Sequence, residues 1–357
     1  MKEKSLNLQP LNGIRGFAVL LVLLSHAANV DIFPVAFINF SGAGHYGVFL
    51  FFVLSSFLLT RQFLVSDRWE AFTLPALRRY FLRRFLRIYP LFTAALLVYF
   101  LLNTIGLPVI PVSGEMFVKS LLLMDAVGIF WTVPVEFQFY FILPLIAAAL
   151  TLPVGTVAVL INGGIFCILW SSFFPPEFNG NLLSFLPIFI MGSLSARLHC
   201  SVVNRQKGVN VTGGKNAIWY NRSAFLFMMS FIVFTPAMYA LLFPFAPLEN
   251  VVLQHQFLLF SLLSSGFVLL SLFSNGMVHW LMESRFFVFW GRISFSAYLG
   301  HNIILAAVHE LNVLPSSVQF VLFFAGTALF SYLSYSYFER PLSTMSFGQK
   351  KRCYGVT

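Results

Sequence analysis

The chain is poor in the residues on which soluble, secreted and metal-binding proteins depend. Only 10% of its 357 residues are charged, and there are three cysteines, Cys167, Cys200 and Cys353. The cysteines form no CxxC pair, and neither an HExxH motif, a P-loop nor a His/Cys cluster with metal-ligand spacing occurs. The sequence therefore predicts no disulfide framework, no metal site and no permanently bound cofactor.

The chain is rich in long apolar stretches. Hydrophobic residues make up 59% of the chain and 45 residues are phenylalanine, and the mean hydropathy is +0.84. These values exclude an ordinary soluble globule. Apolar stretches of about 17–25 residues predict transmembrane helices, here an all-α integral membrane protein, a polytopic bundle of about ten. The stretches lie near residues 11–29, 43–60, 85–104, 129–149, 154–174, 182–199, 223–243, 254–274, 292–311 and 317–338.

Basic residues set the predicted orientation. If both termini lie in the cytoplasm, every one of the 22 Lys and Arg residues except Lys119 falls on the inner side. This distribution predicts cytoplasmic N- and C-termini and an even number of spans. Attraction to anionic headgroups of the lipid bilayer then explains the net charge of +10, so no nucleic-acid partner is expected. Residues 1–345 are predicted to form a single transmembrane domain, and residues 346–357 a short basic cytoplasmic tail.

Two ionisable side chains, Arg15 and His26, stand inside the first apolar stretch, eleven positions apart. Eleven steps along an α-helix return to within about 20° of the same face, about 16 Å further along the axis. Ionisable groups at membrane depth cost roughly 2.5–3.5 kcal/mol each and usually mark an ion, proton or substrate path. The alternative interpretation is a polar pair that only packs against neighbouring helices.

The segment from Arg68 to Arg87 alternates apolar residues with arginines at helical spacing. This pattern predicts an amphipathic interfacial helix that continues into the third span, and membrane anchoring alone is one sufficient reason for it. Arg84 and Arg87 are three residues apart, hence on one helix face. Guanidinium groups bind phosphate oxygens bidentately, and all seven basic residues from Arg61 to Arg87 are arginines. The second interpretation is therefore a phosphate receptor.

A carboxylate and a second histidine enter later spans. Glu136 lies in the block 130–140 at the start of the fourth span, and His301 ends the block 290–301 at the start of the ninth. At 1.5 Å per residue, His26 comes out about 22 Å and Glu136 roughly 20 Å above the inner edge of the membrane core. We therefore expect Glu136 to meet His26, with His301 lower, near the midplane. A structural hydrogen bond is the alternative role for each.

These blocks together resemble a known family, the acyltransferase-3 membrane O-acyltransferases of bacteria. The resemblance covers nearly the whole chain. Its motifs, in order, are 11–16 through His26 (Arg-x10-His), 47–58, Arg84-Phe85-Leu86-Arg87, 131–140, 293–301 and Phe338-Glu339-Arg340-Pro341. In three places the chain departs from the family pattern: Ser56 stands where a glycine is usual, and Pro134 and Phe137 replace a common serine and a second acid.

The resemblance implies an activity. A protein of this family would lie in the bacterial inner membrane and move an acyl group from cytoplasmic acyl-CoA to a hydroxyl on the outer side. The acceptor would be a glycan or lipid-linked glycan, such as lipopolysaccharide O-antigen or another surface polysaccharide. Acetyl is the expected group and acetyl-CoA the expected donor substrate, because acetyl is the commonest group in the family.

The resemblance also implies roles for individual residues. His26 would act as general base on the acceptor hydroxyl or as a covalent acyl carrier, and Glu136 would orient His26 or the acceptor. The donor would be bound by Arg15, Arg84 and Arg87. Weaker candidates for lining the path are Ser55, Tyr298 and His301.

A secondary transporter is the alternative from another class of protein, since transporters also have many spans and buried ionisable groups. Two features count against it: no pair of Gly- or Pro-broken spans occupies matching halves of the chain, and the arginines gather at one mouth rather than at the midplane. A purely structural membrane scaffold is the third interpretation.

Overall fold

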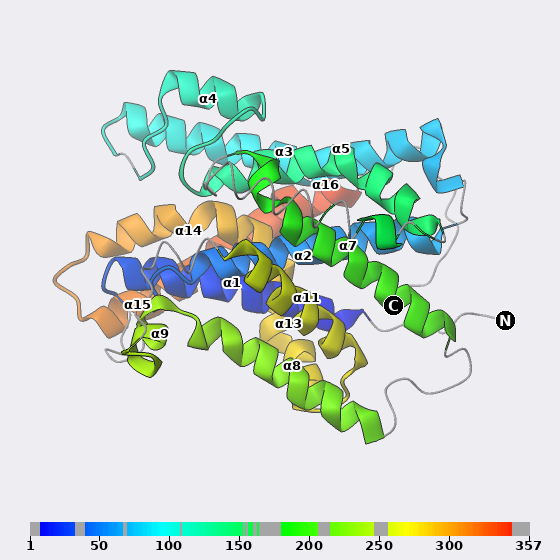
Figure 1. Cartoon of the computed structure of the whole chain (residues 1–357). Coiled ribbons are helices and arrows are strands. Elements are labelled where there is room, and N and C mark those ends of the chain that lie inside the picture. The colour runs from blue at the N-terminus through cyan, green and yellow to red at the C-terminus, as the bar shows by residue number, and fades with distance from the viewer. Residues whose placement is uncertain are drawn as a thin grey trace.

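The structure of the protein is a computed structural model that describes residues 8–32, 40–66, 70–107, 109–152, 154, 156–159, 163, 180–205, 215–245 and 256–344. Within these ranges every regular element is a helix, as predicted (Figure 1). The elements are α1 (Gln9–Asn29), α2 (Gly44–Val65), η1 (Glu70–Phe72), α3 (Leu74–Thr104), α4 (Gly114–Leu121), η2 (Gly128–Trp131), α5 (Thr132–Thr151), α7 (Leu182–Arg205), α8 (Lys215–Val233), α9 (Pro236–Leu242), α11 (Phe257–Phe273), α12 (Met277–Glu283), α13 (Arg285–Arg292), α14 (Ser294–His309), α15 (Ser316–Ser334), η3 (Tyr335–Glu339) and α16 (Arg340–Thr344).

Six helices in the described part of the chain are long and apolar enough to cross a membrane, or up to eight spans if each of two bent helix pairs is one span. These eight fall on eight of the ten predicted stretches. The predicted stretch 292–311 corresponds to α14, which is shorter, with 16 residues. The stretch 154–174 lies almost entirely outside the described residues. The protein is thus a helical multi-span bundle, while the total of ten spans and the orientation stay predictions.

Helix α1 lies at the centre of the bundle. Of its apolar window 72% is buried inside the protein, against 22% for α3 and for the span that contains α15. It packs against α2, α11, α12, α13 and α14. Polar groups on α1 therefore face protein rather than lipid, which lowers the membrane cost of Arg15 and His26.

Glycines bring α12 and α13 directly onto α1. A side-chain carbon added at Gly13 or Gly16 would collide with backbone atoms of α12 or α13, and one added at Gly291 would collide with the backbone of Asn12. Because glycine has no Cβ, the backbones can approach this closely. The two α1 glycines flank Arg15, so this contact holds the arginine's backbone in place.

Two further glycines join α1 to α2. Gly42, Gly44 and Gly47 have the GxGxxG spacing of a dinucleotide-binding loop, but that fingerprint needs a preceding strand and the described residues before them form α1. A Cβ at Gly47 would collide with the carbonyl oxygen of Ala18, and one at Gly44 would press on Ser25. These glycines therefore serve close helix packing.

The arginine-rich segment and the third span form one continuous helix, α3, of 31 residues. A helix of that length extends about 46 Å, more than the roughly 30 Å of a hydrocarbon core. Arg78 and Arg79, in its first turns, are exposed. The predicted continuity with the third span is confirmed from Leu74 onward, whereas the interfacial location of the segment stays a prediction.

Two helix pairs are sharply bent. Helices α8 and α9 meet at 98° where Pro236 begins the second helix, and α11 and α12 meet at 95° at a break that includes Gly276. Proline and glycine both favour such breaks. The two pairs follow one another in the chain, so among the described residues no broken spans occupy matching halves.

Candidate functional site

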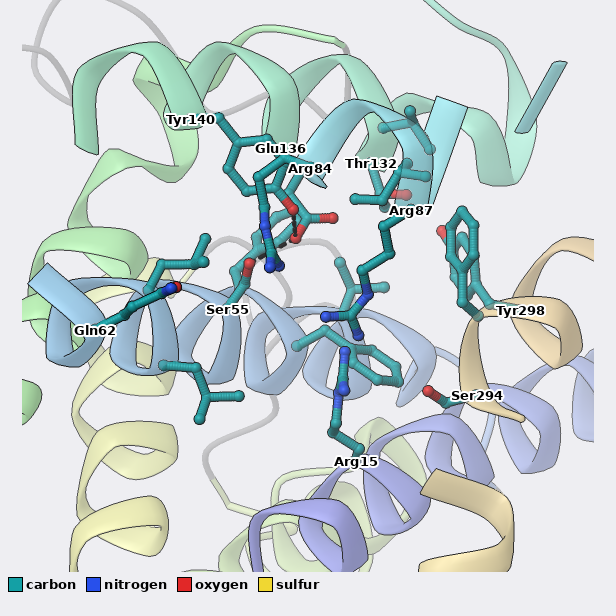
Figure 2. Close-up of a pocket in the computed structure, with 18 residues that line it drawn as sticks. Arg15, Ser55, Gln62, Arg84, Arg87, Thr132, Glu136, Tyr140, Ser294 and Tyr298 are labelled. Carbon is teal, nitrogen blue, oxygen red and sulfur yellow. Dashed lines mark hydrogen bonds between the residues drawn. The ribbon is translucent and has the colours of Figure 1, made fainter. Parts of the chain in front are cut away.

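Three arginines converge on a cavity of about 280 Å³ between α1, α2, α3, α5 and α14. Figure 2 shows Arg84 and Arg87 reaching down from α3 and Arg15 reaching up from α1, with their guanidinium groups directed toward one another. We call this space the arginine cavity. Its polar lining residues are Arg15, Ser55, Gln62, Arg84, Arg87, Thr132, Glu136, Tyr140, Ser294 and Tyr298.

The face of α3 decides which arginines enter the cavity. Arg84 and Arg87 are half-buried, whereas Arg83, directly before Arg84 and about 100° from it around the helix, is exposed. The Nε–H of Arg84 is buried and has no hydrogen-bond partner within the described residues. Buried donors are nearly always paired in native proteins, so this group is suited to an anionic ligand. The three predicted donor-site arginines are brought together as expected.

The carboxylate of Glu136 is held by two hydroxyl groups. Ser55 Oγ and Tyr140 Oη each donate a hydrogen bond of 2.6 Å to the same oxygen, Oε1 (Figure 2). Tyr140 follows Glu136 by one helical turn on α5, and Ser55 reaches across from α2. Glu136 therefore lies in the arginine cavity, where its negative charge offsets part of the positive charge of the arginines.

A second buried acid, Glu339, was named by the sequence only as part of the closing motif. It ends the π-helical turn η3 and is 8% exposed. Ser296 Oγ donates a 2.9 Å hydrogen bond to Glu339 Oε2, and the carboxylate interacts electrostatically with Arg15 and Arg87. The sequence signal that could have marked Glu339 as a site residue is an acid directly after the apolar stretch 317–338. Three guanidinium groups against two carboxylates leave a positive excess.

A second cavity, of about 380 Å³, contains His26. We call it the histidine cavity, and among the residues that the structure describes no Asp, Glu, Lys or Arg lines it. Its polar members come from α1, from residues near the start of α2, and from α14; they are Ser25, His26, Asn29, Ser41, His45, Tyr298 and Asn302. His45 and Asn302 are not among the site residues predicted from the sequence, since neither belongs to a motif.

The two cavities adjoin each other. Val48 and Tyr298 line both of them, and Tyr298 is held in place by donating a 2.7 Å hydrogen bond to the carbonyl oxygen of Ile129. Helix α1 carries Arg15 in one cavity and His26 in the other, about 16 Å further along its axis. Together the cavities form two compartments along the helices, one cationic and one neutral.

His301, not Glu136, is the residue that meets His26. The rings of His26 and His301 have centroids 4.8 Å apart, whereas Glu136 lines only the other cavity. The expectation that Glu136 lies beside His26 is thus not met. Tyr298 is hydrogen-bonded to Ile129 in the 3-10 turn η2, and Glu136 follows Ile129 by seven residues, about two helical turns. The expectation that His301 lies below His26 is also not met. Helix α14 places His301 one turn beyond Tyr298, beside the His26 ring.

The geometry combines a compartment lined by three arginines with a compartment that contains a histidine in largely uncharged surroundings. The first can bind a phosphorylated ligand through guanidinium groups. The second can place an imidazole beside a hydroxyl group for proton transfer or nucleophilic attack. Val48 and Tyr298 form the boundary between the two compartments, because both residues line both cavities.

Comparison with known proteins bears on this arrangement. A family model described as "Acyltransferase domain", the acyltransferase-3 domain, matches residues 9–336. Comparisons with curated proteins and with solved structures gave no match. The matched region includes every helix that lines the two cavities.

Proposed function

Because the chain belongs to the acyltransferase-3 family, it is a multi-span membrane acyltransferase, and we propose that it transfers an acyl group from cytoplasmic acyl-CoA to an extracytoplasmic glycan. The proposed donor is acetyl-CoA, and the proposed acceptor is a hydroxyl of lipopolysaccharide O-antigen, another surface polysaccharide or a lipid-linked glycan. The bacterial inner membrane is the proposed location, since it separates the donor from the acceptor.

The observation that carries this proposal is the adjoining pair of cavities. Arg15, Arg84 and Arg87 offer guanidinium groups to the phosphates of coenzyme A. The pantetheine arm would then carry the thioester past Val48 and Tyr298 toward His26. Neither compartment alone explains why a phosphate-binding site and a histidine lie on one face of α1.

The proposed chemistry has two routes with the same products. In the first, His26 takes the proton of the acceptor hydroxyl, whose oxygen attacks the thioester carbonyl; the C–S bond breaks, and the thiolate of coenzyme A receives the proton. In the second, His26 itself attacks the thioester carbonyl, the C–S bond breaks and the thiolate of coenzyme A leaves. The acceptor oxygen then displaces the imidazole from the acyl group, and the hydroxyl proton passes to the thiolate. Acid-quenched protein without acceptor carries an acyl-histidine only in the second route.

Glu136 has a different proposed role from the one that its sequence position suggested. Since it lies with the arginines and accepts hydrogen bonds from Ser55 and Tyr140, it would position these hydroxyls and moderate the charge of the donor site. Tyr298 would line the passage between the compartments.

Glycan acetylation in cells tests the proposal. Surface polysaccharide is analysed by mass spectrometry from cells with the gene, without it, and with His26→Asn at equal membrane protein level. Asn keeps polarity but cannot titrate, so we expect acetylation to fall on the order of 10²–10⁴-fold. His309→Asn, the same change at an exposed histidine on α14, is the control and should match wild type.

Three results would contradict the proposal. Unchanged acetyl content of all glycans without the gene would exclude the glycan acceptor, and near-normal acetylation by His26→Asn would remove His26 from the reaction. Uptake of a substrate without chemical change would favour a transporter. Broken helices form the substrate site in many transporters, but the bent helices of this protein do not line either cavity.

A further inference from the structure

We infer that His301 is a positioning residue for His26: its Nε2 accepts the N–H of the His26 imidazole and selects the tautomer that reacts. The inference rests on the proposed role of His26 and extends it to a second histidine. Three observations carry it: the hydrogen bonds of His301 Nδ1, the burial of His301 Nε2, and the contact of the two rings.

The backbone of α14 decides the protonation of His301. Its Nδ1 lies 2.7 Å from the carbonyl oxygen of Tyr298 and 3.1 Å from that of Ala297. A carbonyl oxygen only accepts hydrogen bonds, so Nδ1 must carry a proton. In the neutral ring Nε2 then carries none and is an acceptor.

That acceptor is buried and lacks a partner. His301 is 0% exposed, and its Nε2 has no hydrogen-bond partner among the described residues. A buried acceptor that is left unpaired destabilises the folded protein. The structure thus holds a lone pair inside the protein that requires a donor.

His26 is the donor within reach. Its ring meets that of His301 edge to face, at 71° and 4.8 Å between centroids, and it borders the open histidine cavity. The terminal torsion of a histidine side chain is broad, so the ring can turn toward Nε2. Catalytic hydrogen bonds commonly align only when substrate is bound.

The titratable side chains around His26 and His301 are few, and most have other partners. Of the titratable groups near it, Tyr298 donates its hydroxyl to Ile129, and Tyr99 on α3 donates to the carbonyl of Leu299. His45 on α2 lines the same cavity. Within the described part of the chain no acid or arginine lines that cavity, so none of these residues offers a carboxylate for the orienting role that Asp plays in a Ser-His-Asp triad.

The bond would serve either route of transfer. With one nitrogen of His26 donating to His301, the other is unprotonated and turned toward the cavity, ready to take the hydroxyl proton or attack the thioester. When His26 becomes protonated, its N–H remains bonded to Nε2 of His301, which stays neutral. The proton returns to the departing thiolate, so the balance of the reaction is unchanged.

Two substitutions at His301 separate this role from packing. The amide nitrogen of Asn occupies the place of Nδ1, so His301→Asn keeps a donor for the α14 carbonyls and loses the acceptor. The longer Gln side chain places its amide oxygen near Nε2, so His301→Gln keeps the acceptor and loses the donor. We expect His301→Asn to lower transfer roughly 10–100-fold, as loss of an orienting partner does, and His301→Gln to keep most of the rate.

The measurement is the rate of acetyl transfer to surface glycan in membranes with equal protein level, with coenzyme A binding measured in parallel. Coenzyme A affinity should stay unchanged in both variants, because its arginines lie in the other cavity. The double variant His26→Asn/His301→Asn should be no slower than His26→Asn alone, since His301 acts only through His26.

The other possible results contradict either the inference for His301 or the proposed role of His26 on which it rests. Full activity of His301→Asn with low activity of His301→Gln would mean that His301 is purely structural. Losses that multiply in the double variant would exclude action through His26. If His26→Asn alone is near-normal, the proposed function fails first. Should His301→Asn not reach the membrane, equal activity of His301→Gln and His301→Leu would still overturn the inference.

Discussion

Arg83 and Arg84 are neighbours on α3, yet one is exposed and the other is half-buried in the arginine cavity. The difference follows from the helical period, which turns adjacent side chains by about 100°. A single step along the chain therefore separates an arginine at the lipid or water boundary from one that is placed to bind a ligand.

This contrast yields a prediction for donor binding. Arg84→Ala removes charge-assisted hydrogen bonds to phosphate worth about 1.5–3 kcal/mol, so the Kd for coenzyme A should rise about 10- to 100-fold. Arg84→Lys should recover only part of the affinity, because an ammonium lacks the bidentate fork. Arg83→Ala, the matched control, should change Kd by less than about twofold.

Isothermal titration of the purified protein with coenzyme A measures the three variants. Equal affinity of Arg84→Ala and Arg83→Ala, with both proteins folded, would show that the arginines serve membrane anchoring alone. Equal affinity of Arg84→Lys and wild type would mean that charge, not geometry, is what the ligand recognises.

Helices α1 and α13 are the elements whose contact holds the site together. Gly291 on α13 lies against the backbone of Asn12 on α1, three residues before Arg15. The contact has no space for a side chain, so the position of Arg15 depends on a residue that is far away in sequence.

Gly291→Ala tests the contact. The added Cβ would collide with the Asn12 carbonyl oxygen, and relief requires the helices to separate; overpacking of this kind costs about 1–3 kcal/mol. We expect a lower thermal unfolding midpoint in detergent and weaker coenzyme A binding. Gly114→Ala is the control, because nothing lies within 4 Å of its Cβ position. Unchanged stability and binding in Gly291→Ala would show that the contact can relax freely.

At the scale of the whole molecule, the two cavities are stacked along the direction of the spans. Helix α1 runs from the arginine cavity to the histidine cavity, and α2 runs the opposite way. Ile110, shortly before α4, borders the histidine cavity. Figure 1 shows α4 at the end of the bundle that is away from the start of α3. If the arginines face the cytoplasm, α4 must therefore lie on the outer side.

Thiol labelling of intact cells checks this orientation. In a background without the native cysteines, Glu115→Cys on α4 should react with a membrane-impermeant maleimide. Ser66→Cys, at the end of α2, should react only after permeabilisation. Both positions are exposed, and the Glu115–Lys119 surface ion pair lost in the first variant contributes little to stability. The reverse labelling pattern would invert the bundle and exclude cytoplasmic donor binding.

The sequence by itself determined the features that depend on local periodicity. Apolar stretches were sufficient to predict a helical membrane bundle, and the spacing of Arg15 to His26 and of Arg84 to Arg87 predicted shared faces. Those faces are set by the 3.6-residue period, and the structure places each pair as that period requires. No neighbouring helix is needed to make these predictions.

Only the tertiary structure decided which residues meet across helices. Depth estimates treated each span as a straight rod with a known starting point, and so paired His26 with Glu136. In the structure η2 and Tyr298 separate them, and α14 brings His301 to His26 instead. Glu339 likewise approaches Arg15 and Arg87 only because the turn η3 lies against α3. Contacts of this kind depend on where each helix starts, tilts and packs, and no local pattern in the sequence records that information.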